Sequence, residues 1–371
     1  MRNLKLIACV ALVLLFQPVS AAPSAELNAT MQKISEAMLK LLPAVHATDT
    51  PRGDLARDLE LLQELVAEAG PHLADEPLGS RMNYTMLQRQ LQRASSAAGS
   101  SSRHLVKGAV ANAFELCAGC HALDGVRRPA FGVSKLRDLD NFLAGEYSYL
   151  TRDYPAAEVS YLESLKWERE ATSRRADALF RLFALSLMQN DSTRGTISDL
   201  EALAGQDALT DMEADTVRRW QGLLVKVSGE SPGLLSPVAA SSVAGLARML
   251  ASDWPDVRFL LDFSEQQAYW MLVRQRLHEF LAASADPDEL PVMLYWLGVS
   301  DRYLRYQFYE TMAAQYLEEC IRDFPTHPYA GTCYEEYELL MVISYSGSSG
   351  VRLPPDVLQN LEELRALVNR Q

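Results

Sequence analysis

Cys117, Cys120 and His121 form one Cys-x-x-Cys-His run within the stretch "AFELCAGCHALDG". Residues three apart on a helix share a face, so both thiols can reach the two vinyl groups of one porphyrin. The adjacent imidazole would then bind the iron as its proximal ligand. This spacing is that of a c-type haem attachment site, and it predicts one covalently bound haem c.

Two other kinds of site also use a Cys-x-x-Cys pair. A structural zinc site needs a second pair of ligands, and Cys320 and Cys333 are not spaced like one. A redox dithiol normally opens a helix that follows a strand, and no strand is expected before Phe114. Haem attachment is therefore the interpretation that the motif and its surroundings favour.

The first 21 residues have the pattern of a secretory signal peptide. Arg2 and Lys5 supply a positive start, and the apolar run from Leu6 to Phe16 is too short to span a bilayer comfortably. Val19-Ser20-Ala21 has the small-x-small pattern of a cleavage site. We expect cleavage after about Ala21 and a periplasmic protein, and no later segment is apolar enough over a sufficient length to cross a membrane.

The chain is acidic, with a net charge of −13 that becomes −15 once Arg2 and Lys5 leave with the signal peptide. Such a chain is a poor candidate for binding nucleic acid or anionic lipid surfaces. Basic redox partners, or basic patches on larger assemblies, would be favoured. Whether the protein forms oligomers is left open.

Two cysteines remain outside the motif and the leader, Cys320 and Cys333. An exported protein meets an oxidising compartment, where the two could pair. The bridge would close a loop of about fourteen residues and contribute roughly 3 kcal/mol on the chain-entropy model. The alternative is a pair of buried free thiols.

Four amphipathic helix patterns precede residue 125. Their apolar positions recur at spacings of three and four, and Gly70-Pro71 and the run "GSSS" at 99–102 interrupt them. Helices with such short connections form an up-down-up-down four-helix bundle. We therefore predict an all-α protein whose first domain covers residues 22–125.

The stretch "DGVRRPAFG" at 124–132 is linker-like. The sequence after it has the pattern of successive pairs of helices. The run from Gly145 to Leu165 has a small residue where two helices would cross, and Ala157 is expected to open the second helix. This run resembles a tetratricopeptide repeat, as do 176–204 and 294–340. We predict such repeats over 126–230 and further helical repeats over 231–371, with 243–290 helical but assigned to no repeat. The alternative is an unrelated helical domain.

The first domain also resembles a known family. "GAVANAFELCAGCHA" is similar to the last helix of cytochrome c-prime, and "LNATMQKISEAMLKLL" is similar to the first helix of cytochrome b562. The resemblance covers roughly residues 25–125 and implies a four-helix haem domain that transfers electrons in the periplasm. The haem-ligating methionine of cytochrome b562 lies where Met31 lies here. The long C-terminal part has no counterpart in either family.

The predicted topology indicates the same distal ligand. Helices one and four run antiparallel, so His121, near the end of the fourth, faces the start of the first, where Met31 lies. Met38 would lie about 10 Å deeper along the axis. The alternatives are that Met31 is an ordinary core residue, because methionine fills apolar gaps well, or that another side chain binds the iron.

The function that we expect depends on which groups bind the haem iron. Histidine and methionine together give a six-coordinate iron suited to moving one electron, and the repeats would then dock a redox partner. An open position would instead suit a gas-binding or sensing protein of the cytochrome c-prime type. A structural subunit of a redox complex is a further alternative. A haem enzyme such as a peroxidase would need a distal acid-base residue, and the sequence offers no convincing one, so we expect no enzyme activity.

Overall fold

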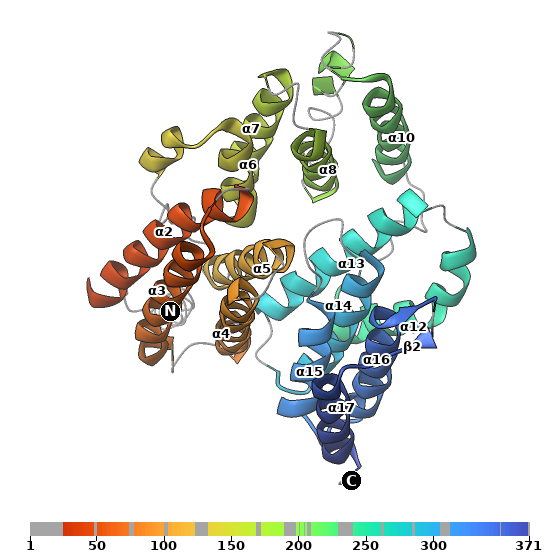
Figure 1. Ribbon diagram of the computed structural model, residues 1–371. Helices are drawn as coiled ribbons and strands as arrows, with labels where there is room; N and C mark the ends of the chain where they lie inside the picture. The colour runs from red at the N-terminus through yellow and green to blue at the C-terminus, as the bar shows by residue number, and fades with distance from the viewer. Residues whose placement is uncertain are drawn as a thin grey trace, which may run out of the picture.

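The computed structural model describes most of the chain from Ala25 onward (Figure 1). The described residues are 25–47, 50–73, 78–99, 103–122, 133–167, 172–188, 198–199, 201–203, 205, 209–228, 240–260, 263–283, 286–304, 312–348 and 350–369. The predicted signal peptide, the linker-like stretch at 124–132 and most of the one at 229–242 lie outside them.

The described residues are almost entirely helical, so the all-α prediction is confirmed. The N-terminal helices are α2 (Ala25–His46), α3 (Arg52–Ala69), α4 (Leu78–Gly99) and α5 (Arg103–Ala122). The middle helices are α6 (Asn141–Leu150), α7 (Tyr154–Trp167), α8 (Thr172–Met188) and α10 (Asp211–Ser228). The C-terminal helices are α12 (Val243–Leu260), α13 (Phe263–Ala283), α14 (Leu290–Leu304), α15 (Ala313–Asp323), α16 (Tyr329–Ser344) and α17 (Pro355–Val368). Short 3-10 helices η2 (Gly70–Leu73) and η3 (Val133–Asp138) and the antiparallel pair β1 (Ser346–Gly347) and β2 (Gly350–Val351) complete the described elements.

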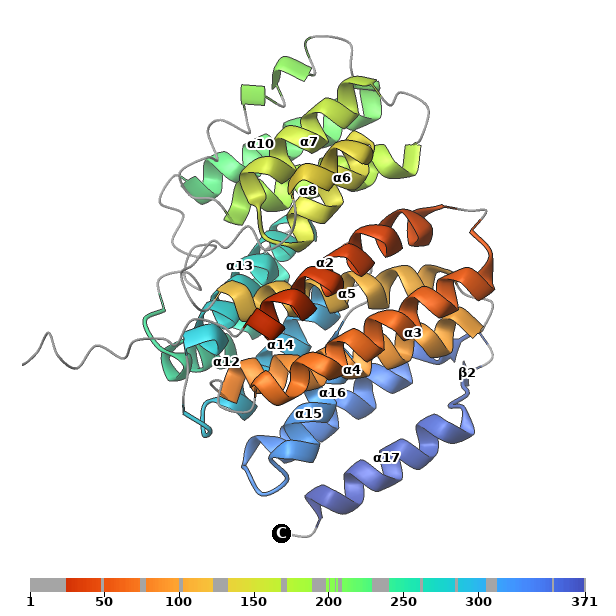
Figure 2. The ribbon, with the colours of Figure 1, turned by 90° about the vertical axis from the view of Figure 1, so that its left-hand side faces the viewer.

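The N-terminal helices pack in a closed ring of neighbours. Helix α2 contacts α3, α3 contacts α4, α4 contacts α5, and α5 returns to α2. Figure 2 shows these four helices lying side by side. On α2, Ile34, Met38, Leu41, Leu42 and Val45 are buried, which is the face that the three-and-four spacing of apolar residues predicts.

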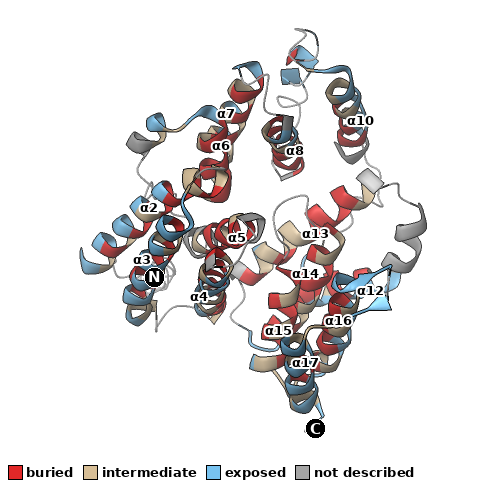
Figure 3. Ribbon diagram, viewed as in Figure 1, coloured by how far each residue is buried: buried red, intermediate tan, exposed pale blue. Residues whose placement is uncertain are grey.

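The remaining helices pack mainly as neighbours along the chain. Helix α6 packs on α7 and α7 on α8, and α13 to α17 each pack on the next. There are exceptions: α6 also contacts α2 and α5, and α13 contacts α4, α5, α8 and α10, so that α13 touches all three groups of helices (Figure 1). The buried residues gather where the helices face one another, whereas α3 and α17 each keep an exposed outer face (Figure 3).

The α6–α7 pair depends on a close approach at Gly145. A Cβ atom at this position would lie 2.7 Å from the buried ring of Tyr161, so a larger residue does not fit without movement. Gly298 of α14 faces Leu317 of α15 in the same way, at 2.6 Å. Both pairs thus cross at a glycine, as the sequence pattern predicted for Gly145.

The start of α7 differs from the prediction. The helix begins at Tyr154, three residues before Ala157, which lies fully buried inside it. The Asp153 carboxylate accepts a hydrogen bond from the Ala156 N–H at 3.4 Å, and Pro155 occupies a position in the first turn that tolerates proline. Capping by Asp153 therefore moves the helix start towards the N-terminus.

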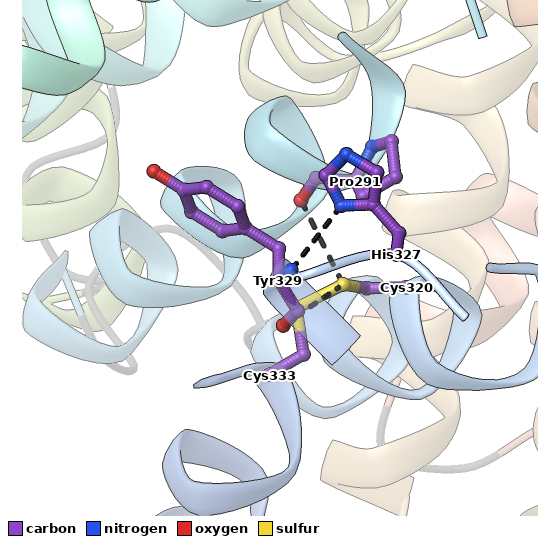
Figure 4. The surroundings of a disulfide bond; sticks show 5 residues. All are labelled: Pro291, Cys320, His327, Tyr329 and Cys333. Atoms are coloured by element: carbon purple, nitrogen blue, oxygen red, sulfur yellow. Dashed lines mark hydrogen bonds between the residues drawn. A yellow bond between two sulfur atoms is a disulfide. The ribbon is translucent and has the colours of Figure 1, made fainter. Parts of the chain in front are cut away.

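Cys320 of α15 and Cys333 of α16 form a disulfide, the pairing that the sequence predicted (Figure 4). Both residues are fully buried. His327 lies in the turn between the two helices, where its Nδ1 accepts a hydrogen bond from the Tyr329 N–H at 3.2 Å (Figure 4). The bridge fixes the α15–α16 pair.

Candidate haem-attachment site

The whole Cys-x-x-Cys-His motif lies within the last turns of α5. Cys117 is half-buried and packs against the apolar core. The side chains of Cys120 and His121 lie outside the described residues, but their backbone is helical. Because α5 is helical through the motif, residues 117 and 120 share one face, as attachment of both thiols to one macrocycle requires.

His46 and Lys107 fix the relative direction of α2 and α5. His46 ends α2, and burial together with the nearby charge of Lys107 lowers its pKa to about 4. Lys107 lies in the first turns of α5, so the end of α2 lies beside the start of α5. The two packed helices are therefore antiparallel, and the start of α2 lies beside the motif.

This register brings Met31 level with His121. Met31 precedes His46 by fifteen residues, or about 22 Å of helix, and His121 follows Lys107 by fourteen, or about 21 Å. Met38 is only about 12 Å from His46 by the same measure, and its side chain is fully buried. Met31 is half-buried and lies against the core. Of these two methionines, Met31 is thus at the right level for a group bound by His121.

Four of the histidines outside the motif lie away from it, whereas His72 lies in η2, in the connection between α3 and α4 at the same end of these helices as the motif. His46 is at the opposite end of α2 from Met31, and His104, whose side chain is outside the described residues, is at the opposite end of α5 from His121. His278 is buried on α13 with its ring 6.3 Å from that of Tyr316, and burial lowers its pKa well below the usual value. His327 lies in the α15–α16 turn described above.

The face of α5 that carries Glu115 is tied to the C-terminal helices. Arg274 of α13 donates from Nη2 to Glu115 Oε2 and from Nε to Asp301 Oδ1, each at 2.8 Å. Asp301 Oδ2 in turn accepts the Met312 N–H at 2.8 Å. Burial raises the pKa of Asp301 despite these partners. Burial is also the largest single influence on Glu115, but the charge and hydrogen bond of Arg274, together with the charges of Arg152 and Arg181, outweigh it and lower the pKa of Glu115.

A buried polar cluster around Glu146 of α6 was not among the sites that the sequence predicted. The Tyr161 hydroxyl donates to Glu146 Oε1 at 2.7 Å, and Arg181 Nε donates to the same oxygen at 3.1 Å. His46 Nε2 lies 4.0 Å from the other oxygen. Burial is the largest single influence on Glu146 and opposes its ionisation, but the charge of Arg181, the Tyr161 hydrogen bond and the other neighbouring cations together outweigh burial and keep the pKa of Glu146 below the usual value. The available signal was a carboxylate in the middle of the otherwise apolar run "LAGEYSYL".

The donor set fits covalent haem better than the alternatives. The motif closes a helix, whereas a redox dithiol gains its low thiol pKa at a helix start. The Cys320–Cys333 disulfide removes the second thiol pair that a four-cysteine zinc site would need. A thiol pair on one helical face, an adjacent imidazole and a thioether at the same level are the groups that hold haem c.

No known relative emerges. Comparisons with protein-family models, with curated proteins and with solved structures all find no match. Among the helices of the described part of the chain, none has the length and apolar character needed to cross a membrane.

Proposed function

We propose that this protein is an exported monohaem c-type cytochrome that carries electrons in the periplasm. In this proposal α2 to α5 form a four-helix haem domain, and the later helices form a tetratricopeptide-like domain that docks a redox partner. Cys117 and Cys120 anchor the haem, His121 is its proximal ligand and Met31 its distal ligand. Haem held in this way supplies one-electron redox chemistry.

The packing of α2 on α5 supports the proposal, because helical rise counted from His46 and Lys107 gives Met31 and His121 a similar height on antiparallel helices. An imidazole and a thioether that bind one iron from opposite sides must lie at the same height between their helices. Met31 is half-buried beside the core, so its thioether has apolar neighbours that would limit access of water. Exclusion of water favours a filled sixth position and raises the reduction potential.

The helical pairs support the docking role. The α6–α7 and α14–α15 pairs each cross at a glycine, and successive pairs pack on one another, as in repeat proteins with extended binding surfaces. The net charge of −13 favours a basic partner surface. Linking such a surface to the haem domain would raise the local concentration of the haem near its partner.

The disulfide supports export. Disulfides persist in oxidising compartments such as the bacterial periplasm and are rare in the cytosol. Haem attachment to two thiols and a buried Cys320–Cys333 bridge both fit the leader pattern at residues 1–21.

The test is an absorption spectrum of the purified mature protein, in the ferric state and then reduced, with and without carbon monoxide. We expect one covalent haem per chain and a low-spin spectrum that carbon monoxide does not change. Met31→Ala should open the sixth position and give a high-spin spectrum that carbon monoxide shifts.

Met38→Ala is the matched control, because Met38 is on the same helix but fully buried in the core. It should cost about 2–5 kcal/mol of stability and leave the spectrum low-spin. If both variants keep a low-spin spectrum, Met31 is not the ligand. A high-spin spectrum in the unchanged protein would favour gas binding over electron transfer. Absence of covalent haem would refute the proposal.

A structural role is the second alternative, because successive helix pairs that pack on one another can also present an extended surface that holds a complex together. Cys117→Ser/Cys120→Ser removes haem attachment. If this variant restored assembly of a complex in a strain lacking the protein, the scaffold role would hold. If only the haem-bearing protein restored respiration or electron flow, the cytochrome role would hold.

A further inference from the structure

We propose that Arg274 is a positioning residue that holds the motif-bearing end of α5 against the C-terminal helices, and that its pairing with Glu115 tunes the reduction potential of the haem. This inference rests on the proposed haem attachment. It adds that the haem domain is fixed to the repeats by an ionic clamp rather than linked to them only by the chain.

The clamp is a single guanidinium group that holds two carboxylates. Arg274 of α13 bonds to Glu115 of α5 and to Asp301 of α14, each at 2.8 Å. The bond from the Met312 N–H to Asp301 extends the contact to the start of α15. Helix α5 is therefore joined, through one cation and one carboxylate, to three successive helices that are distant from it along the chain.

The clamp is sheltered from water. The side chains of Glu115 and Arg274 are 21% and 25% exposed, and that of Asp301 is 7% exposed. Charged groups with this little solvent around them interact over longer distances than exposed ones do. Loss of either charge would therefore change the electrostatic potential at groups on the other side of α5.

Glu115 and Cys117 lie on nearly opposite sides of α5. They are two residues apart, which is a rotation of about 200° and a rise of about 3 Å. The clamp thus binds the side of α5 that faces away from the thiol. The distance between the clamp and the Cys117 thiol is about one helix diameter, or roughly 12 Å. At this position it can orient the helix without occupying the space that a macrocycle needs.

Other charged and titratable groups also face the clamp. Arg152, in the turn between α6 and α7, acts on Glu115, and Tyr316 of α15 and the buried His278 of α13 lie near Arg274. Arg152 bears the same charge as Arg274, but in the described part of the chain it acts on Glu115 through its charge, whereas Arg274 is hydrogen-bonded to it. Arg274 is therefore the cation whose removal leaves Glu115 without its bonded partner.

The two charges predict opposite effects on the haem. Removing the Glu115 anion makes the oxidised, more positive iron less favourable and raises the reduction potential. Removing the Arg274 cation leaves Glu115 unbalanced and lowers it. The roughly 12 Å between the clamp and the thiol sets an upper limit, because one unit charge at that distance and an effective dielectric constant of about 20 changes the equilibrium constant for reduction by about tenfold.

The experiment is a double-mutant cycle on the full-length, haem-loaded protein, read out by spectroelectrochemical titration. Glu115→Gln should raise the potential, Arg274→Gln should lower it, and the double variant should lie near the unchanged protein. Arg274→Lys keeps the charge and should restore most of the potential. Arg276→Gln is the control, because Arg276 is on the same helix but bonds to Ala240 and Glu279, and it should leave the potential unchanged.

Several outcomes would overturn the inference. If Glu115→Gln and Arg274→Gln shift the potential in the same direction, the pair only supports folding around the haem. If neither shifts it while haem remains attached, the clamp is irrelevant to the haem, and the proposed function still stands. Should Arg274→Gln fail to accumulate, the rise expected for Glu115→Gln decides the question. Absence of haem from the unchanged protein would instead refute the proposed function itself.

Discussion

Arg89 of α4 contacts Glu319 of α15, whose side chain is fully buried where the N-terminal and C-terminal helices meet. Gln90 and Gln315 form a hydrogen bond beside this pair, and Gln315 also donates to the Met86 carbonyl oxygen at 2.9 Å. Neither carboxyl oxygen of Glu319 has a hydrogen-bond partner of normal geometry among the described residues. The interface between the two groups of helices therefore contains a carboxyl group that is poorly solvated.

Stability should depend on the protonation of Glu319. Burial, opposed by Arg89 and assisted by Asp323, raises its pKa from 4.5 to about 7. The unfolded chain therefore loses this proton at lower pH than the folded protein does. The contribution of Glu319 falls as pH rises from about 4.5 to 7, by no more than about 3 kcal/mol. Glu319→Gln should be more stable than the unchanged protein above pH 7, as measured by denaturant unfolding.

The control for this prediction is Glu335→Gln on α16, which changes the net charge equally at an exposed position. It should leave the dependence of stability on pH unchanged. An equal gain in both variants would point to general charge repulsion rather than to the buried carboxyl group.

His46 should produce the opposite dependence on pH. Its pKa falls from 6.5 to about 4 in the folded protein, chiefly through burial and then through Lys107. As pH falls, His46 is therefore protonated in the unfolded chain at a higher pH than in the folded protein. The free energy of unfolding falls by about 3 kcal/mol between about pH 6.5 and 4. His46→Gln should weaken this acid-side loss in unfolding measurements from pH 4 to 7. Because Glu319 acts in the opposite sense, Glu319→Gln should make the same loss steeper, and a parallel shift in the two variants would contradict both assignments.

The crossing of α6 and α7 should not tolerate a side chain at Gly145. A methyl group there would meet the Tyr161 ring at 2.7 Å, and Tyr161 is itself held by Glu146. We expect Gly145→Ala to cost about 1–3 kcal/mol in thermal or denaturant unfolding. Gly222→Ala on α10 is the matched control, because nothing lies within 4 Å of its Cβ position. It should stabilise the protein by about 0.5–1 kcal/mol, and a similar loss in both variants would show that Gly145 has no special packing role.

The features that could be predicted from sequence are those set by local spacing. The helical patterns before residue 125 depend on apolar residues three and four positions apart, and the structure has helices over all four of them. The pairing of Cys320 with Cys333 was accessible because few cysteines were available. The haem motif is likewise a local pattern, although its occupancy stays a prediction.

The features that could not be predicted are set by topology. Glu115 and Arg274 are 159 residues apart, and Gln90 and Gln315 are 225 apart. No local pattern reveals which charged residues will meet when α13 crosses several helices. Glu146 is a similar case, because its partners Tyr161 and Arg181 come from two later helices. Such pairs follow from how the helices pack, which the spacing within one helix does not determine.

Reduction of the Cys320–Cys333 bridge should destabilise the C-terminal helices. The bridge joins α15 to α16 through two cysteines that are 13 positions apart in the sequence. Its loss should therefore lower the free energy of unfolding by about 3 kcal/mol on the chain-entropy model. Unfolding of the Cys320→Ala/Cys333→Ala variant, compared with the unchanged protein under oxidising and reducing conditions, measures this cost. Because the motif is on a different helix, the variant should keep its covalent haem and its absorption spectrum. Loss of haem from the variant would mean instead that folding of the haem domain depends on the α15–α16 pair, through contacts such as Arg89 to Glu319.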